Sequence, residues 1–320
     1  MTRYLITGGA GYVGTALLPL IAAEQGQVRR FFRGEKAPAS APGLAVEDFV
    51  GDVRSSDDLT RALAGIDVVL HLAAQTSVYV AEADPAADVE ANVLPMLRLL
   101  EACRALGSKP TVVLASTATI YGVSPPLPVG EDAPAAPVTV YDLHKLAAER
   151  YLAHYVQEGH VRGASLRLAN VYGPGPKSSR PDRGVLNGMV RRALSGETLK
   201  IYGTGEFLRD YVYVDDVARA FLLAAARADA LAGRAVPVAS GDGHTFAQAI
   251  GLVARLVGER TSREVRVEHV EPPAGLSRIE NRSFVADPRG LHASLGFVAE
   301  ISLEQGIQRT IEYFTAQGAT

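Results

Sequence analysis

Short apolar runs and longer segments of helical periodicity alternate through the first half of the chain. Apolar and β-branched residues dominate five short stretches, each bounded by Gly, Pro or charged residues, and this pattern predicts strands. These stretches are residues 3–7, 27–32, 45–50, 66–74 and 110–116. Between them, apolar positions recur at helical spacing in residues 13–26, 55–65 and 84–107. Alternation of this kind is typical of a parallel sheet covered by helices on both faces.

The pattern changes after residue 172. Residues 173–184 are rich in Pro and Gly and are expected to form a surface loop, and residues 270–283 form another irregular, partly basic stretch. The elements that follow each stretch are too short for complete strand–helix–strand units. We therefore expect an α/β protein with one large doubly wound parallel sheet and a smaller C-terminal lobe built from separate segments.

Composition excludes several classes of partner. The 320 residues are 48% hydrophobic and 21% charged, and the formal net charge is −3 without a block of like charges. No nucleic-acid or membrane partner is therefore expected. A single cysteine, Cys103, excludes an intrachain disulfide and a multi-cysteine metal site, and no metal is expected. Because no apolar run approaches ~20 residues and no signal-peptide pattern opens the chain, we expect a soluble, cytoplasmic protein.

Gly8, Gly11 and Gly14 form a glycine-rich turn directly after the first expected strand. Glycines at this spacing permit a tight turn, close approach of the backbone to a pyrophosphate, and close packing of a helix on the strand. The N–H groups at the start of the following helix then face the anion. Glycine turns also occur for steric reasons alone, so this motif by itself leaves both interpretations open.

Motifs farther along the chain favour the dinucleotide interpretation. STATIYG at 116–122 ends the fifth expected strand, and YDLHK at 141–145 opens a helix. The other motifs are GDV at 51–53, HLAAQ at 71–75, NV at 92–93, RLANVYGPG at 167–175 and LRDYVYVDDVARA at 208–220. Over nearly the whole chain, this series resembles the extended short-chain dehydrogenase/reductase family, the NAD(P)-dependent nucleotide-sugar epimerases and dehydratases.

The resemblance implies a Rossmann-type, dinucleotide-binding domain at residues 1–172, to which 208–255 returns. A substrate-binding lobe is then formed mainly by 173–207 and 256–320, and a homodimer is expected. The resemblance also implies which residues bind the dinucleotide. These are Gly8, Gly11, Tyr12, Val13, Gly14, Arg33, Asp52, Val53, Leu72, Ala73, Ala74, Asn92, Tyr141 and Lys145.

Tyr141 and Lys145 lie four residues apart and therefore share one face of a helix. An ammonium at that distance stabilises the phenolate form that a tyrosine base needs. The resemblance makes Tyr141 the acid/base and places Lys145 at the nicotinamide ribose. It selects Thr117 as the hydroxyl that orients the substrate oxygen, with Thr119 as a lesser candidate and Ser116 as a structural hydroxyl.

The end of the second expected strand bears on the choice of cofactor. NAD enzymes of this class usually carry an Asp there, whereas this chain has Phe32 followed by Arg33. A guanidinium suits the additional phosphate of NADP, so Arg33 favours NADP, and NAD is the alternative. The resemblance also implies which residues contact the substrate. These are Ser77, Thr117, Asn170, Arg209 as a pyrophosphate clamp, and Arg278 as a second clamp.

Two functions fit these residues. The first is an NAD(P)-dependent nucleotide-sugar epimerase, acting most simply at carbon 4 of an NDP-hexose. The alternative is an NADPH-dependent reductase of an NDP-4-keto-6-deoxyhexose, which Arg33 favours. Dehydration is disfavoured, because Ala118 and Thr119 occupy the places of an Asp-Glu pair that supplies acid and base in the 4,6-dehydratases.

Overall fold

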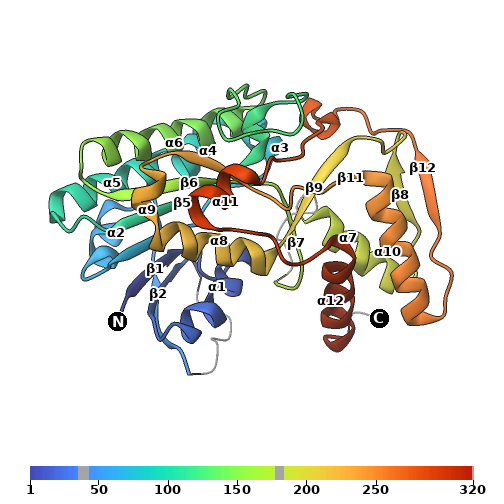
Figure 1. Ribbon diagram of the computed structural model, residues 1–320, viewed down its shortest axis with the longest axis horizontal. Coiled ribbons are helices and arrows are strands. Elements are labelled where there is room, and N and C mark those ends of the chain that lie inside the picture. The colour runs from blue at the N-terminus through green and yellow to red at the C-terminus, as the bar shows by residue number, and fades with distance from the viewer. Residues whose placement is uncertain (35–42, 177–183, 319–320) are drawn as a thin grey trace.

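A seven-stranded parallel sheet forms the centre of the larger part of the molecule. The computed structural model describes residues 1–34, 43–176 and 184–318 (Figure 1). The strands lie in the order β3, β2, β1, β4, β5, β6, β10, and each neighbouring pair is parallel. Their bounds are β1 (Arg3–Thr7), β2 (Gln27–Phe32), β3 (Ala45–Val50), β4 (Val68–His71), β5 (Thr111–Thr117), β6 (Arg162–Leu168) and β10 (Ala235–Val238). All five expected strands are present.

Helices cover both faces of this sheet, because successive residues of each buried strand point to opposite sides. Ile6 of β1 packs in one core with α1, α8 and α11, whereas Leu5 packs in another with α2, α5 and α6. These helices are α1 (Tyr12–Ala23), α8 (Val214–Ala226), α11 (Arg289–Leu295), α2 (Ser56–Leu63), α5 (Leu94–Leu106) and α6 (Val140–Gln157). The expected doubly wound, Rossmann-type α/β fold is confirmed. The strand order reverses between β1 and β4, the place where such sheets bind ligands.

The helix expected over residues 84–107 is two helices, α4 (Pro85–Asn92) and α5. Val93 separates them, and Pro95 stands in the first turn of α5. Proline has no N–H and is tolerated at a helix start but not in an interior, which is why the periodic stretch divides there. A short helix that the pattern does not predict, α3 (Val78–Ala83), precedes them.

The smaller part of the molecule has a core of its own, at the right of Figure 1. Three helices surround it, α7 (Val185–Leu194), α10 (Phe246–Thr261) and α12 (Leu303–Ala316), together with strands from two small sheets. The strands are β8 (Leu199–Tyr202) with β12 (Val267–Val270), and β7 (Asn170–Tyr172), β9 (Leu208–Tyr213) and β11 (Gly243–Thr245). The remaining elements are α9 (Ala228–Leu231) and the 3₁₀ turns η1 (Ala118–Tyr121) and η2 (Arg278–Asn281).

The segment 208–255 is shared between the two parts. Helix α8 and strand β10 belong to the core of the large sheet, whereas α10 packs in the core of the smaller part. The exact division of the chain into two domains stays a prediction. The chain passes several times between the large sheet and the smaller part, so residues of both parts meet at their junction.

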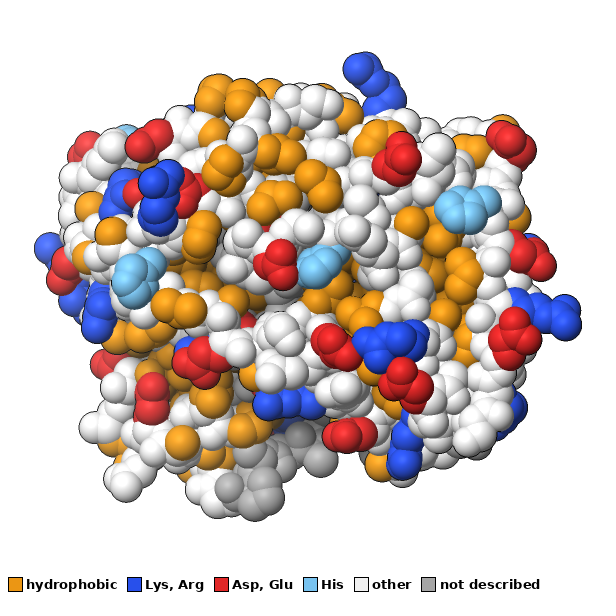
Figure 2. Space-filling model, turned by 45° about the vertical axis from the view of Figure 1, so that its right-hand side comes forward, with side chains coloured by type: hydrophobic (Ala, Val, Ile, Leu, Met, Phe, Trp, Pro, Cys, Tyr) orange, Lys and Arg blue, Asp and Glu red, His pale blue; other side chains and the backbone are white. Residues whose placement is uncertain are grey.

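The surface carries charges of both signs. Figure 2 shows acidic and basic side chains interspersed over the face drawn, with hydrophobic side chains among them. Within the described part of the chain, no helix has the length and apolar character needed to cross a bilayer.

Candidate active site

The glycine-rich turn joins β1 to α1 and is closed by main-chain contacts. Gly8 has a φ of +68°, and a Cβ atom there would lie 2.9 Å from the backbone nitrogen of Ala73. A Cβ atom on Gly14 would lie 2.8 Å from the carbonyl oxygen of Gly8. Both positions require glycine, because a side chain at either one would push apart main-chain segments that have little freedom to move.

The first turn of α1 offers its N–H groups to an anion. The helix begins at Tyr12, and its N-cap residue, Gly11, makes no side-chain cap. The first N–H groups of a helix have no partner within the helix and carry a partial positive charge. The main chain of Tyr12, Val13 and Gly14 therefore suits a pyrophosphate, which the absence of side chains at the turn lets approach closely.

The side chain of Tyr12 links this turn to the smaller part of the molecule. Its hydroxyl donates to the carbonyl oxygen of Gly173 at 2.7 Å and accepts from Nδ2 of Asn187 at 3.2 Å. A Cβ atom on Gly175 would lie 2.5 Å from the Tyr12 ring. The start of α1 is therefore packed directly against the connection between β7 and α7.

The segment after β4 lies against the glycine turn. The N–H groups of Leu72 and Ala73 donate to the carbonyl oxygen and the hydroxyl of Thr7, at 3.1 and 3.2 Å. Asn92 is buried and donates to the carbonyl oxygen of Gln75 at 2.9 Å. Its Oδ1 atom is buried and has no partner among the described residues. Since buried acceptors are normally satisfied, this orphaned oxygen and the glycine cradle fit a bound dinucleotide.

Arg33 follows β2 and its side chain is 71% exposed. Its nearest acidic partner is Asp52, with Nη1 3.9 Å from Oδ2. Asp52 is held more closely by Arg54, which donates from Nη2 at 2.6 Å, and these hydrogen bonds lower the pKa of Asp52 to about 2. Arg33 therefore makes only a loose ion pair and remains able to meet an anion.

Helix α6 presents Tyr141 and Lys145 one turn apart on the same face. Tyr141 is buried against Val78 and Ile279. Because Ile279 belongs to η2, the C-terminal part of the chain covers this tyrosine. Tyr141 thus lies where the large sheet and the smaller part of the molecule meet.

Lys145 is buried, and this burial lowers the pKa of its amine to about 8. The carboxylates of Glu149 and Asp88 oppose the shift by favouring the charged form. A buried ammonium gains from any oxygen that accepts its hydrogen bonds. The hydroxyl groups of a nicotinamide ribose would supply such oxygens.

Thr117 ends β5 and is hydrogen-bonded toward α6. Its hydroxyl is 2.8 Å from that of Thr119, and Thr119 donates to Oδ1 of Asp142, a fully buried residue in the first turn of α6. Ser116 donates instead to Glu149 at 2.5 Å, and its structural role stays a prediction. The contacts join the end of β5 to the helix that carries Tyr141.

Arg209 lies on β9 and is 7% exposed, and its side chain points toward the backbone of η2. Its guanidinium donates to the carbonyl oxygens of Leu208 at 3.1 Å and Glu280 at 2.5 Å, and to that of Arg282. Burial lowers its pKa, whereas Tyr211 and Glu280 favour its charged form. Arg209 therefore holds the backbone of η2, and its contact with a pyrophosphate stays a prediction.

Asn170, at the start of β7, accepts from Nη2 of Arg282 at 3.0 Å. Burial and the neighbouring charge of Arg209 lower the pKa of Arg282 to about 10. The carboxylate of Asp142 favours its charged form. Arg282 is thus bonded to Asn170 and lies near Asp142, the carboxylate that accepts from Thr119, and these residues come from distant stretches of the sequence.

The sequence patterns do not single out Asp142 or Arg282. The signal for Asp142 is an acid directly after the tyrosine of the YDLHK motif, where it falls in a buried first turn. Arg278 is exposed at the start of η2, and Ser77 caps α3 by accepting from the N–H of Val80 at 3.4 Å. Substrate contacts by Arg278 and Ser77 stay predictions.

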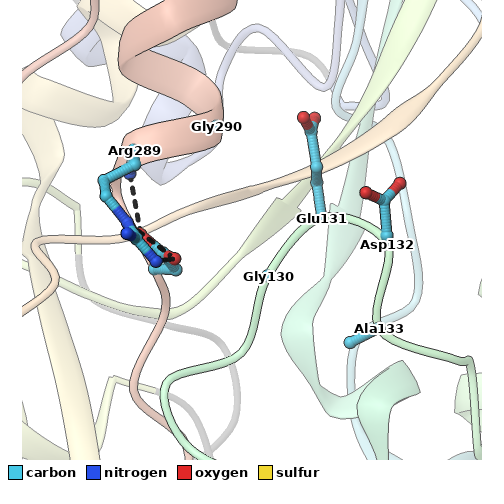
Figure 3. Close-up of a pocket in the computed structure, with 7 residues that line it drawn as sticks. Gly130, Glu131, Asp132, Ala133, Arg289 and Gly290 are labelled. Atoms are coloured by element: carbon cyan, nitrogen blue, oxygen red, sulfur yellow. Dashed lines mark hydrogen bonds and ion pairs between the residues drawn. The ribbon is translucent and has the colours of Figure 1, made fainter.

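A hollow of about 420 Å³ lies elsewhere on the molecule, between the loop at Gly130–Ala133 and the start of α11 (Figure 3). Arg289 is paired there with Asp287, with Nη2 2.6 Å from Oδ2. None of the expected site residues lines this hollow. Among the described residues, no group of three or more His, Cys, Asp or Glu side chains is placed to hold a metal ion.

Comparison with known proteins agrees with the geometry. The model of the NAD dependent epimerase/dehydratase family matches residues 4–239. A UDP-glucose 4-epimerase of Mycolicibacterium smegmatis is 32% identical over 319 residues, which cover 98% of both chains.

Two solved structures share the whole fold. A UDP-glucose 4-epimerase of Thermus thermophilus, in complex with NAD, is 32% identical with a TM-score of 0.84, over 98% of this chain and 99% of that one. A UDP-glucose 4-epimerase of Thermotoga maritima, with UDP-glucose, is 29% identical with a TM-score of 0.86, over 99% of both chains. The expected family, the enzymatic class and an NAD(P) cofactor are confirmed. The chain belongs to the NAD dependent epimerase/dehydratase family, within the extended short-chain dehydrogenases/reductases.

Proposed function

We propose that this protein is an NAD(P)-dependent epimerase that inverts carbon 4 of a UDP-linked hexose. The observation that carries the proposal is the hydrogen-bonded join between Thr117 and the first turn of α6, the helix that carries Tyr141 and Lys145. The three relatives compared above are named UDP-glucose 4-epimerases, which supports the choice of nucleotide and of carbon.

The glycine turn, residues 72–74 and Asn92 would hold the dinucleotide, with Asp52 and Val53 at its adenine and Lys145 at its nicotinamide ribose. The bound dinucleotide supplies both the acceptor and the later donor of a hydride at its nicotinamide ring. The side chains of the protein handle the proton of the reacting hydroxyl.

Tyr141 exchanges that proton. As a phenolate it accepts the proton of the 4-hydroxyl while the carbon–hydrogen bond is lost and the carbonyl forms. It returns the proton when the alcohol forms again. Thr117 hydrogen-bonds the same oxygen, and the ammonium of Lys145 stabilises the phenolate. For inversion, the sugar turns between the two half-reactions and presents its other face.

We assign the diphosphate of the substrate to Arg209 and Asn170, which lie on the paired strands β9 and β7. A guanidinium can pair two phosphate oxygens at once, and for this contact Arg209 would have to give up hydrogen bonds to the carbonyl oxygens of Glu280 and Arg282. Arg278 and Ser77 are further candidates for contacts with the nucleotide sugar. We further propose a cytoplasmic homodimer.

A second candidate function rests on Arg33. Its exposed guanidinium is free to meet the additional phosphate of NADP. An epimerase recycles its cofactor and does not need that phosphate, whereas a reductase of an NDP-4-keto-6-deoxyhexose consumes NADPH. A preference for NADP therefore favours the reductase.

One experiment tests both candidates. The purified protein is incubated with UDP-glucose without added cofactor, and formation of UDP-galactose is followed by chromatography. The nucleotide that the protein releases on denaturation is identified by mass spectrometry. We expect conversion with retained NAD, and Tyr141→Phe should lower the rate at least ~100-fold because the proton-transferring oxygen is lost. Wild-type turnover in that variant, or conversion that needs added NADPH, would contradict the proposal.

A further inference from the structure

The side chain of Tyr12 crosses from the glycine turn to the smaller part of the molecule. Its hydroxyl donates to the carbonyl oxygen of Gly173 at 2.7 Å and accepts from Nδ2 of Asn187 at 3.2 Å. Asn187 is a buried residue of α7, and Gly173 directly follows β7. We call these three residues the clasp.

Asn187 by itself satisfies the main chain of Gly173. Its Oδ1 atom accepts from the N–H of Gly173 at 3.0 Å, and its Nδ2 atom donates to the carbonyl oxygen at 2.9 Å. The hydroxyl of Tyr12 is therefore an additional donor to a carbonyl oxygen that already has one. A phenylalanine in its place would leave neither main-chain group of Gly173 without a partner. The hydroxyl thus adds a bond between the two parts of the molecule, and it is not needed to satisfy a buried group.

The segment on the far side of the clasp lies between two aromatic rings. A Cβ atom on Gly173 would lie 2.8 Å from the ring of Tyr213, and one on Gly175 would lie 2.5 Å from the ring of Tyr12. Close-packed groups transmit displacements to one another. A movement of Tyr12 is therefore passed on to residues 173–175.

Tyr12 serves two sites through two different groups. Its main-chain N–H lies in the first turn of α1, which suits the pyrophosphate of the dinucleotide. Its hydroxyl holds the connection from β7, the strand of Asn170, to α7. We propose that Tyr12 is a positioning residue that fixes the smaller part of the molecule relative to the bound dinucleotide. Its effect on the sugar rests on the proposed epimerase, in which the nicotinamide and carbon 4 have to meet.

Hydride transfer depends steeply on this relative position. A displacement of about 1 Å that originates far from the reacting atoms can slow a reaction about 100-fold. The glycine turn places the dinucleotide, whereas strands β7 and β9 place the diphosphate of the substrate. The clasp joins the two by hydrogen bonds of a neutral hydroxyl, because burial raises the pKa of Tyr12 and keeps its proton in place.

The first measurement is amide hydrogen exchange, with NAD alone as the probe. If bound NAD holds Tyr12 and Tyr12 holds the clasp, NAD should slow the exchange of the N–H groups of α7 by about 2- to 10-fold, the range for one hydrogen bond. Tyr12→Phe should abolish this slowing, while its affinity for NAD stays at the wild-type value by calorimetry. No nucleotide sugar takes part, so the result does not depend on the reaction.

The second measurement is the rate at which UDP-glucose reduces the NAD-loaded protein in the first turnover, followed by absorbance. Tyr12→Phe should slow this step roughly 5- to 50-fold without a change in the affinity for UDP. Asn187→Ala breaks the clasp from its other side and should slow the step at least as much. The double variant should be no slower than Asn187→Ala, because both substitutions remove the same contact. The affinity for UDP and the melting temperature show that each variant is folded.

Tyr172→Phe is the matched control. The hydroxyl of Tyr172 also donates to main-chain carbonyl oxygens, those of Ser302 and Leu303, at 3.2 and 3.3 Å. These bonds stay within the smaller part, whose core contains both Tyr172 and Leu303. Tyr172→Phe should lower the melting temperature about as much as Tyr12→Phe. The slowing of exchange by NAD and the rate of hydride transfer should both stay at their wild-type values.

The outcomes separate this inference from the proposed function. If NAD protects α7 equally in the wild type and in Tyr12→Phe, or protects it in neither, the positioning role is wrong and the epimerase is unaffected. A wild-type rate of reduction in Tyr12→Phe, or an equal loss of rate in Tyr172→Phe, would also overturn that role. If the wild type neither reduces its NAD nor converts any UDP-hexose while Tyr12→Phe still abolishes the protection, the epimerase is wrong and Tyr12 still fixes the two parts.

Discussion

The glycine turn after β1 and the η2 segment both border the active site, but they are held in different ways. The turn is main chain packed on main chain, with Gly8 against the backbone of Ala73. The backbone of η2 is held by a side chain from far away in sequence, because Arg209 donates to the carbonyl oxygens of Glu280 and Arg282.

This difference separates the two binding tasks. Every dinucleotide presents the same pyrophosphate, and a rigid main-chain cradle recognises it without side chains. The sugar has to turn during the proposed reaction, and η2, which covers Tyr141, is held by side-chain hydrogen bonds from Arg209. Substitutions at the turn should therefore affect the dinucleotide, and substitutions beneath η2 should affect the substrate.

The largest effect is expected from Gly8→Ala. The new Cβ atom combines a positive φ with a contact of 2.9 Å to the backbone of Ala73, which together should lower the free energy of unfolding by about 3–5 kcal/mol. Displacement of the turn should weaken dinucleotide binding by at least ~100-fold. Gly107→Ala is the matched control, because Gly107 has a φ of +62° with nothing within 4 Å of an added Cβ atom. Titration calorimetry and thermal melts compare the two, and equal losses would show that backbone strain alone, and not the close packing, is responsible.

Lys145 lies on the same helix as Tyr141, and Lys145→Met should stabilise the dinucleotide-free protein while abolishing turnover. The pKa of its amine is about 8 in the folded protein against an ordinary value of 10.5. At about 1.4 kcal/mol for each pH unit, burial of the charged amine costs about 3 kcal/mol below pH 8. Because the unfolded chain binds this proton more tightly, the stability of the wild type should rise from pH 8 to about 10.5.

Denaturant unfolding at pH 7 and pH 10 checks this prediction. The stability advantage of Lys145→Met over the wild type should be full at pH 7 and should shrink as the pH approaches 10.5. Lys200→Met, at an exposed position, is the control and should show neither effect. A Lys145→Met variant less stable than the wild type at pH 7 would mean that the ammonium is fully compensated in its site.

Arg209→Ala should disturb the η2 segment and the substrate contacts beside it. Loss of charge-assisted hydrogen bonds worth about 1.5–3 kcal/mol should raise the KM for UDP-glucose by roughly 10- to 150-fold. The affinity for the dinucleotide should stay at the wild-type value, because the turn holds it independently. Arg209→Lys keeps the charge but loses the planar guanidinium, so its KM for UDP-glucose should lie between those of the wild type and Arg209→Ala. A variant that loses dinucleotide instead would remove the distinction between the regions.

Arg33→Ala is expected to have the smallest effect. The guanidinium is exposed and its ion pair with Asp52 is loose, so its loss should weaken NADP binding by about 5-fold and leave NAD binding unchanged. Fluorescence titration with each dinucleotide measures the pair of affinities. Arg54→Ala is the control, because Arg54 binds the same carboxylate more closely. Equal losses for NAD and NADP would make Arg33 irrelevant to the choice of cofactor.

The sequence by itself determined the sheet, the family and the ordered motifs. Buried parallel strands are apolar throughout, and the glycine turn depends on backbone geometry that only glycine permits, so both leave local marks in the chain. The spacing of Tyr141 and Lys145 is equally local, since one helical turn brings them to the same face. The break at Val93 was also within reach, because Pro95 marks the start of a second helix.

Only the tertiary structure decided what surrounds the reacting groups. From the local sequence, Asp142 is predicted only to be an acidic residue in the first turn of a helix. Its hydrogen bond to Thr119 forms because β5 and α6 pack side by side. Arg282 lies in an irregular stretch without periodicity, and it reaches Asn170 across 112 positions of the sequence. Hydrogen bonds between side chains from distant segments depend on how the elements pack, and neither spacing nor composition encodes them. These hydrogen bonds near the reacting groups therefore depend on the tertiary structure.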